Sequence, residues 1–394
     1  MTPAALLPHL RPFSSTIFAE MTALAQRHDA VNLGQGFPDT DGPQAMLAAA
    51  TEAINGGFNQ YAPGMGMPVL REAVAADRAA RYGQVHDPDT EVLITVGATE
   101  AITAAVLALV APGAEVLLIE PYYDSYPVAV ALAGAVRRTV ALVPDGNRFA
   151  IDIDALRAAI TPRTRMLLLN SPHNPTGTVF TAHELAAIAA IACEHDLLVL
   201  TDEVYEHLVF DGRRHQPLAT LPGMAQRTLS VSSIAKSFSA TGWKTGWICG
   251  PAELVGAVKT VKQFLTFVGA TPLQLAAAHA LTHEQDWVLG LRDSLQGKRD
   301  LLSTALADAG LRVHASEASY FVCADAGALG VRDAAALCRE LPARIGVAAV
   351  PVSVFCDAPT AEQPPWRQLL RFAFCKRDEV LREAAHRLQA LSDE

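Results

Sequence analysis

Short apolar runs alternate with alanine-rich segments along most of this 394-residue chain. The runs are rich in Val, Ile and Leu, and they predict strands at 91–96, 115–119, 165–169, 197–201, 228–231 and 246–249. The intervening segments show helical periodicity, most clearly at 99–110, 182–195 and 252–264. Because these strands are apolar on both faces and alternate with helices, we expect a mostly parallel sheet covered by helices on both sides.

The pattern changes near residue 291. A long helical segment begins there, followed by strand-like runs at 320–324, 347–350 and 369–374 and by a final helix. A chain of this length needs more than one hydrophobic core. We therefore expect an α/β protein with a large domain at 46–290 and a smaller α+β domain formed by 1–45 together with 291–394.

Composition narrows the possible partners. The net charge is −10 and no segment concentrates Lys or Arg, which argues against nucleic acid or an anionic membrane. No apolar stretch is long enough to span a bilayer, and residues 1–15 lack the pattern of a signal peptide. The 6 cysteines contain no C-x-x-C pair, so we expect free thiols and no metal site. These features predict a soluble cytoplasmic protein.

Polar residues follow several of the predicted strands. NSPHNPTG (170–177) follows one strand, Asp202 follows the next, and SSIAKSFSATGWKTGW (232–247) follows a third. VGATEA (96–101) joins an earlier strand to a helix. Ligands of open α/β sheets bind at the carboxyl ends of the strands. We therefore expect these four loops to meet at one edge of the sheet.

Each residue in these loops permits two interpretations. Lys236, in a Ser/Gly-rich loop, is either a solvated lysine or an amine that bonds a carbonyl group, kept neutral by the nearby cation Lys244. Asp202 is either a helix N-cap or a buried anion with a functional partner, and Tyr205 either packs or presents its hydroxyl beside it. Gly97 begins a helix whose free amide groups attract phosphate, although glycine is common at that position.

The turn NSPHNPTG is likewise either an ordinary loop or a rigid support for the amide of Asn174. His173 in the same turn is expected to be structural.

Seven motifs occur in a fixed order along the chain. They are NLGQGFPD (32–39), NQY (59–61), EPYYDSY (120–126), NSPHNPTG, TDEVY (201–205), SSIAKSFSATGWKTGW and RFAFCK (371–376). Together they resemble the fold-type I, class I/II aminotransferases, which depend on pyridoxal 5′-phosphate, and in particular the kynurenine/glutamine/methionine-type subgroup. The resemblance extends from Arg11 to the C-terminal helix. It implies ping-pong transfer of an amino group between an amino acid and a 2-oxo acid.

The resemblance also implies roles for individual residues. Lys236, Asp202 and Tyr205 would be catalytic: Lys236 bonds the cofactor and moves a proton, Asp202 pairs with the ring nitrogen, and Tyr205 contacts the phenolic oxygen. The implied cofactor site comprises Gly97, Ala98, Thr99, Tyr123, Asn174, Asp202, Tyr205, Ser233, Lys236 and Lys244, with Tyr61 contributed by the second subunit of a homodimer. Lys244 replaces the arginine of most class I members and keeps its positive charge.

Substrate residues follow from the same resemblance. Arg371 and Gly36 would bind the substrate carboxylate, together with Asn174. Phe18, Tyr126 and Phe355 match aromatic positions of the substrate pocket, and plain core packing is an equal alternative for all three. Gly269 and Ala270 stand where related enzymes carry aromatic or histidine side chains, which predicts a wider pocket for a substrate longer than kynurenine.

GQGFPDTDGP, DEVYEHLVFD and GVAAVPVSVFCD are most similar to the N-succinyldiaminopimelate aminotransferases of lysine biosynthesis. The expected substrates are therefore N-succinyl-LL-2,6-diaminopimelate and 2-oxoglutarate. The alternatives are a kynurenine-, glutamine- or methionine-type aminotransferase, a cysteine-conjugate β-lyase on the same lysine, and a regulatory or structural relative without activity. A regulatory relative usually carries a DNA-binding module, for which the chain has no space, and its acidic charge also disfavours that role.

Overall fold

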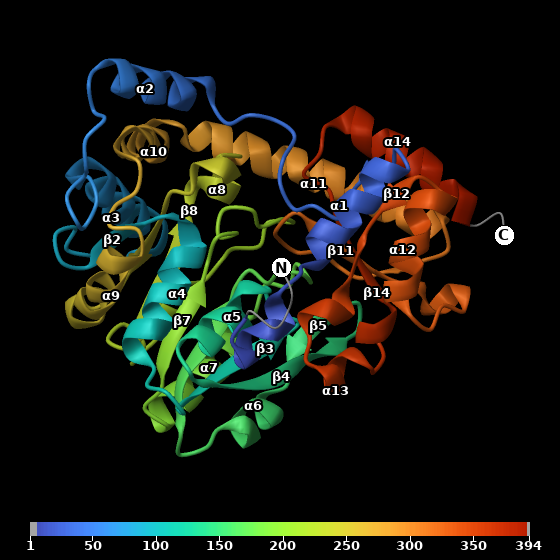
Figure 1. Cartoon of the computed structure of the whole chain (residues 1–394), viewed down its shortest axis with the longest axis horizontal. Coiled ribbons are helices and arrows are strands. Elements are labelled where there is room, and N and C mark those ends of the chain that lie inside the picture. The colour runs from blue at the N-terminus through green and yellow to red at the C-terminus, as the bar shows by residue number, and fades with distance from the viewer. Residues whose placement is uncertain (1–5, 392–394) are drawn as a thin grey trace.

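The computed structural model describes residues 6–391. Residues 1–5, which open the stretch without a signal-peptide pattern, and residues 392–394 of the predicted small domain lie outside the described residues. An eight-stranded sheet forms the centre of the molecule (Figure 1). Its strands, in spatial order, are β2 (Val92–Thr95), β9 (Gly246–Cys249), β8 (Thr228–Ser233), β7 (Leu198–Asp202), β6 (Thr164–Asn170), β3 (Glu115–Glu120), β4 (Val136–Asp145) and β5 (Arg148–Ile151).

This sheet is mostly parallel, as predicted. Strands β9 and β5 run in the opposite direction to the other six strands. Alternate residues of the central strands enter two separate cores: Leu117 and Ile119 of β3 enter one, and Val116 and Leu118 enter the other. The first core is covered by α6 (Ile153–Ala159) and α7 (Ala182–Glu194), and the second by α4 (Gly97–Leu109), α5 (Ser125–Leu132) and α9 (Ala252–Leu265). The α/β fold class predicted from the apolar strands is confirmed.

Local sequence signals set several helix ends. Thr181 and Glu184 form a capping box at the start of α7, each side chain bonding the other's backbone amide. A third group of helices packs near the β2 end of the sheet: α2 (Gln44–Asn55), α3 (Pro68–Tyr82) and α10 (Thr271–His283). The α3 helix begins at a proline and ends at Gly83, whose φ of 68° is the left-handed conformation that terminates helices.

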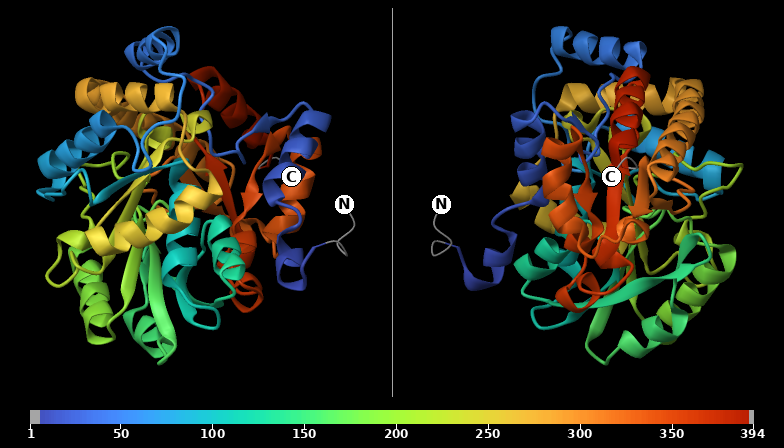
Figure 2. Two further views of the ribbon diagram at one scale, coloured as in Figure 1. Left: turned by 60° about the vertical axis from the view of Figure 1, so that its left-hand side comes forward. Right: turned by 90° about the vertical axis from the view of Figure 1, so that its right-hand side faces the viewer.

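The C-terminal part of the chain forms a second sheet. Its strand order is β10 (Arg312–Val313), β11 (Phe321–Asp325), β14 (Leu369–Ala373) and β13 (Val350–Pro351), and its helices are α12 (Ala334–Arg344), α13 (Ala358–Ala361) and α14 (Asp378–Leu388). The long helix α11 (Gln285–Asp308) leads into this part, and α14 runs beside it (Figure 2).

The N-terminal segment lies against this second sheet, although it is distant in sequence. Helix α1 (Ile17–Arg27) contacts α12, and strand β1 (Val31–Asn32) pairs in parallel with β12 (Val347–Ala348), as the blue and orange-red elements of Figure 1 show. The remaining regular elements are the one-turn helix α8 (Ile234–Ser237) and the 3₁₀ helices η2 (Pro8–Phe13), η3 (Leu218–Thr220), η4 (Thr241–Trp243), η5 (Ala326–Leu329), η6 (Val352–Phe355), η7 (Trp366–Gln368) and η8 (Gln389–Leu391). Among residues 6–391, no helix is both long and apolar enough to cross a membrane.

Candidate active site

The predicted loops meet at one edge of the large sheet. In the strand register, Asn170 at the end of β6 lies beside Asp202 at the end of β7, and Ser233 at the end of β8 lies beside Gly246. Thr95, at the end of β2, pairs with the same Gly246, and α4 begins two residues later. Hydrogen bonding between the strands therefore brings together side chains that are far apart in sequence.

A cavity of about 250 Å³ opens at this edge. Its wall contains most of the residues singled out in the sequence: Phe18, Gly36, Gly97, Ala98, Thr99, Tyr123, Tyr126, Asn174, Asp202, Tyr205, Ser233, Lys236, Lys244 and Arg371. It also contains residues that sequence reasoning did not select: Gln35, Phe37, Ile102, Asn170, Val204, Ala235, Thr241 and Phe321. Several of these are immediate neighbours of selected residues, so adjacency to a motif was the available signal.

Lys236 lies in α8, a single helical turn, and the expected loop at this position is wrong. The turn forms because the amide of Phe238 bonds the carbonyl of Ile234, whose buried side chain anchors the segment. Burial lowers the pKa of Lys236 to about 8, and this effect outweighs the opposing influence of Cys375 and Asp202. Lys244 lowers the same pKa but contributes less than burial. Near physiological pH the neutral fraction of the amine is therefore much larger than for an ordinary lysine, and it becomes the major form above about pH 8.

Asp202 is a buried carboxylate without a cationic partner. The Tyr126 hydroxyl donates to Asp202 Oδ2 at 2.6 Å, and the amide of Val204 donates to Oδ1 at 3.3 Å. Among residues 6–391, no Lys, Arg or His lies within ion-pair distance of this carboxylate, and burial raises its pKa. Because Asp202 faces the cavity, a ligand that presents a positively charged N–H would satisfy it.

Tyr126 is the most important residue that the sequence left ambiguous. Its role goes beyond core packing or lining the substrate pocket, since its hydroxyl donates a hydrogen bond to Asp202. Its spacing from Tyr123, one helical turn along the start of α5, places both side chains on the cavity wall. That spacing within EPYYDSY was the signal that could have identified it.

The start of α4 and Lys244 form a cradle suited to an anion. Gly97 has a φ of 75°, and a Cβ there would lie 3.2 Å from Lys244 Nζ. A Cβ on Gly246 would lie 2.8 Å from the carbonyl carbon of Gly97. Lys244 itself has a φ of 51°, which is uncommon for a residue other than glycine and occurs often at functional sites. Two glycines thus allow a lysine ammonium to approach helix-start amide groups, as phosphate binding requires.

Arg371, on β14, forms the opposite wall of the cavity. Its Nη2 donates to the carbonyl of Gly34 at 2.9 Å, and its Nη1 donates to Asn174 Oδ1 at 3.2 Å. The guanidinium carbon lies 4.0 Å from the centre of the Phe321 ring and 5.2 Å from that of Phe18. The planar group is therefore held in one orientation at the cavity.

Two further aromatic rings, Phe355 and Phe321, pack close to this arginine. Phe355 was expected to contact substrate, but it lies outside the cavity wall. It packs behind the arginine, 5.1 Å from the guanidinium carbon, because it belongs to the buried core of the C-terminal part. Gly36 faces Phe321 so closely that a Cβ there would lie 2.4 Å from the ring.

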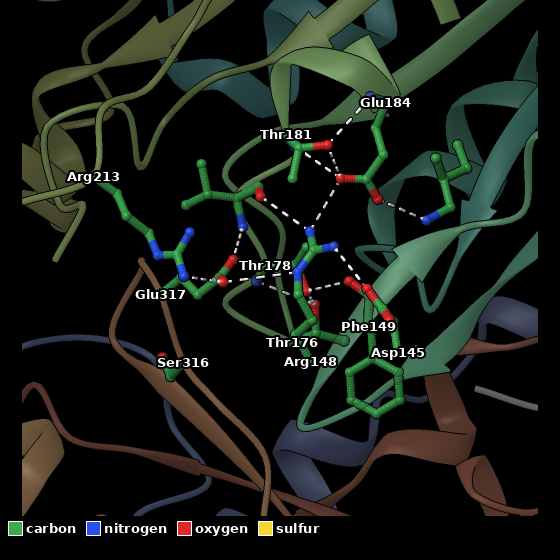
Figure 3. Close-up of polar contacts among 12 residues, drawn as sticks. Asp145, Arg148, Phe149, Thr176, Thr178, Thr181, Glu184, Arg213, Ser316 and Glu317 are labelled. Carbon is green, nitrogen blue, oxygen red and sulfur yellow. Dashed lines mark hydrogen bonds and ion pairs between the residues drawn. The ribbon is translucent and has the colours of Figure 1, made fainter. Parts of the chain in front are cut away.

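The Asn174 turn is held in place by a polar network between the two sheets (Figure 3). The buried carboxylate of Glu317, from the segment between β10 and β11, accepts from the amide of Val179 at 2.9 Å. Its other oxygen lies 3.0 Å from Arg213 and 3.7 Å from Arg148, which also pairs with Glu184 at 3.1 Å. The network joins the segment after the Asn174 turn to the sheet that includes the strand of Arg371.

Four other residues considered in the sequence analysis lie outside this cavity wall. Tyr61 is 81% exposed and packs edge-to-face on Phe267, with 5.1 Å between the ring centres. Gly269 and Ala270 border the same separate groove as Tyr61. His173 is buried, with Nδ1 2.8 Å from Thr176 Oγ1 and a pKa that burial lowers to about 3.

The chain is similar to known aminotransferases along nearly its whole length. Residues 28–388 match the family described as aminotransferase class I and II. The chain is 59% identical to the probable N-succinyldiaminopimelate aminotransferase of Mycobacterium tuberculosis over 98% of both chains, and 40% identical to the methionine aminotransferase of Escherichia coli over 99% of both. The solved structure of the N-succinyldiaminopimelate aminotransferase from Mycobacterium tuberculosis superposes with a TM-score of 0.95, covering 98% of this chain and 100% of the other.

Proposed function

Because the chain belongs to the class I and II aminotransferases, we propose that it transfers amino groups with pyridoxal phosphate bound at Lys236. The observation that carries this assignment is the pairing of two groups in one cavity. Lys236 has a pKa lowered to about 8, and Asp202 is a buried carboxylate that forms no ion pair with any of residues 6–391. A neutral amine can bond an aldehyde, and a buried anion can hold a pyridine nitrogen in its protonated form.

The rest of the cavity fits the same cofactor. The amide groups of Gly97, Ala98 and Thr99, with Ser233 and Lys244, offer donors and positive charge to a phosphate. Tyr205 and Asn174 would bond the phenolic oxygen. Tyr123, which also lines the cavity, would cover one face of the ring.

Pyridoxal phosphate, when bound, withdraws electrons from the substrate Cα and so lets its proton leave. Asp202 would keep the ring nitrogen charged, and Tyr126 fixes the orientation of that carboxylate through its hydrogen bond. The Nζ of Lys236 would be the base that takes the proton from the substrate Cα and the acid that gives it back. Arg371 and Gly36 hold the substrate carboxylate, so that the Cα–H bond faces Lys236.

The proposed substrates are N-succinyl-LL-2,6-diaminopimelate and 2-oxoglutarate. The support is 59% identity along nearly the full length of a protein named for that activity, against 40% for a methionine aminotransferase. We therefore place the enzyme in lysine biosynthesis. Its cytoplasmic location stays a prediction from the sequence.

The proposed assembly is a homodimer in which Tyr61 reaches the phosphate site of the second subunit. Large apolar side chains are exposed around Tyr61 and the end of α9: Phe58, Tyr61, Phe264, Leu265 and Phe267. Tyr61 and Phe267 are in contact, and exposed apolar side chains of this kind suit burial in a subunit interface.

Half-reactions with single amino acids test the substrate assignment. Each donor is added to the pyridoxal phosphate-loaded enzyme, and bleaching of the visible absorbance band is followed in time. We expect glutamate and N-succinyl-LL-2,6-diaminopimelate to bleach the band faster than methionine, kynurenine or glutamine. Faster bleaching by methionine would favour the methionine-type alternative. Release of pyruvate from a cysteine conjugate without any 2-oxo acid would instead indicate β-lyase activity.

A further inference from the structure

A chain of buried polar groups reaches Lys236 from the side of α8 that faces away from the cavity. The next residue, Ser237, is buried, and its Oγ lies 2.7 Å from His207 Nδ1. His207 follows β7 by five residues, and its Nε2 lies 3.6 Å from Asp77 Oδ2 of α3. Asp77 is in turn held by Arg81, whose Nε donates at 2.8 Å. Two elements, the segment after β7 and, through His207, helix α3, therefore reach the turn that carries the lysine.

These contacts matter because α8 contains only four residues. One helical turn has too few internal hydrogen bonds to be stable alone, so tertiary contacts fix its position. Ile234 and Phe238 anchor the two ends of the turn through apolar burial, which sets position but not rotation. The bond from Ser237 to His207 is directional and adjoins Lys236. It is therefore the contact best placed to set the direction in which the lysine side chain leaves the helix.

The carboxylate of Asp77 lies on the Nε2 side of the His207 imidazole at a distance that permits electrostatic attraction but not a hydrogen bond. With an anion on the Nε2 side, the favoured neutral tautomer carries its proton on Nε2, which leaves Nδ1 to accept from the Ser237 hydroxyl. The three residue types are those of a hydrolase triad. Ser237, however, is 1% exposed and lies outside the cavity wall, so it cannot act as a nucleophile.

A second buried cluster lies close in sequence but has a different character. Glu203, Glu206 and His215 could together surround a cation. The guanidinium of Arg78 already lies 2.9 Å from Glu203 and 3.0 Å from Glu206, which satisfies both carboxylates. This cluster is therefore an internal ion-pair network, and none of its ion pairs among residues 6–391 reaches α8.

We propose that His207 is a positioning residue for Lys236, acting through Ser237 and oriented by Asp77. The proposal rests on the assignment of Lys236 as the cofactor lysine. It requires that the Ser237–His207 bond align the amine with its reaction partner, because misalignment lowers the rate of a reaction between neighbouring groups. Arg371, the proposed carboxylate-binding group, bonds Gly34 and Asn174 and neither Ser237 nor His207, so we expect substrate affinity not to depend on the Ser237–His207 bond.

Two variants of His207 distinguish its contact with Ser237 from its contact with Asp77. Asparagine at this position carries a polar atom near the place of Nδ1, whereas glutamine carries one near the place of Nε2. His207→Gln therefore loses the acceptor for Ser237, and His207→Asn retains a partner for it. Ser237→Ala removes the same bond from the other side by deleting one hydroxyl.

The experiment measures the rate at which pyridoxal phosphate attaches to the full-length apoprotein, from growth of the visible band, and then kcat and KM of the loaded enzyme. We expect Ser237→Ala and His207→Gln to slow attachment and lower kcat by about tenfold, the effect of one hydrogen bond, with KM unchanged. We expect His207→Asn to stay close to wild type. A structural role alone would lower the melting temperature of all three variants and leave attachment rate and kcat intact, which would overturn the proposal.

The possible outcomes can still be distinguished if one variant does not fold. Should His207→Gln not fold, Ser237→Ala decides, since it removes only a hydroxyl. If wild type forms no visible band with pyridoxal phosphate, the assignment of the cofactor lysine is wrong. If wild type forms the band and Ser237→Ala attaches the cofactor equally fast, only the role of His207 is wrong.

Discussion

Tyr126 shows how one hydroxyl can tune the acidic end of the cavity. Its bond to Asp202 favours the charged form of a carboxylate whose pKa burial raises. Because burial and the hydrogen bond shift the pKa of Asp202 in opposite directions, the charge of this carboxylate depends on the hydrogen bond. The tyrosine therefore matters for chemistry although it would contact the cofactor only through Asp202.

We predict that Tyr126→Phe lowers kcat about tenfold, since hydrogen bonds to charged groups contribute more than neutral ones. Loss of the bond raises the pKa of Asp202 further, so the acidic limb of the kcat profile should move to higher pH. The measurement is kcat against pH for wild type and variant. Tyr122→Phe is the matched control, because that hydroxyl bonds Asp357 at 2.8 Å outside the cavity wall. An unchanged acidic limb in Tyr126→Phe would contradict the role.

The lowered pKa of Lys236 leads to a second prediction. The neutral amine attacks the aldehyde, and the neutral fraction rises until the pH exceeds a pKa of about 8. The rate of pyridoxal phosphate attachment to the apoprotein should thus increase with pH and level off above about pH 9. Stopped-flow absorbance at a series of pH values measures it. A rate that still climbs beyond pH 10, as for an ordinary lysine, would show that burial does not lower this pKa.

At the scale of elements, the site depends on contacts between segments of the two sheets. The segment that carries Glu317 also gives backbone hydrogen bonds to both neighbouring loops: its amide donates to Gly177, and its carbonyl accepts from Phe210. A Cβ on Gly177 would lie 2.6 Å from Ser316 Oγ, so the two segments are in close contact. The segment at 316–317 thus links the Asn174 turn to the loop that contains Phe210.

We predict that Glu317→Ala lowers the free energy of unfolding by about 3 kcal/mol, because it leaves Arg148, Arg213 and a backbone amide short of a partner. Urea unfolding followed by circular dichroism measures the change. Glu383→Ala is the control: it breaks the exposed pair with Arg387 and should cost less than about 1 kcal/mol. Equal losses in the two variants would show that the network in Figure 3 does not stabilise the fold.

Sequence patterns predicted the elements that periodicity controls and missed those that tertiary contacts create. Strands such as β6 and β7 are apolar on both faces, so their position and parallel pairing followed from the chain itself. The turn α8 was expected as a loop, because its Ser/Gly composition carries no helical signal and its anchors, Ile234 and Phe238, act only in the folded molecule. The sequence left Phe355 open between substrate contact and core packing for the same reason, since burial behind Arg371 is a property of the assembled core.

At the scale of the whole molecule, the chain exposes the surface that a partner would cover. Phe264 is 83% exposed near Tyr61, although large aromatic side chains are usually buried. Tyr61 lies outside the cavity of its own chain, so a phosphate contact by Tyr61 requires a second copy. Assembly and activity are therefore linked in this account.

We predict that Phe264→Glu produces monomers of low activity, because a charge placed in an apolar interface is costly to bury. Light scattering after size exclusion gives the mass, and the transamination assay gives the activity. The control is Val85→Glu, which alters an equally exposed side chain (88%) outside the apolar set around Tyr61. A fully active monomer would contradict the shared-site dimer.

The most direct test of the central claim is to trap the cofactor on the protein. The enzyme is incubated with pyridoxal phosphate and reduced with borohydride, and the modified peptide is then mapped by mass spectrometry. The account predicts one modified lysine, Lys236, a visible band before reduction, and neither band nor transamination in a folded Lys236→Ala variant. Modification of a different lysine, or transamination retained by Lys236→Ala, would contradict it.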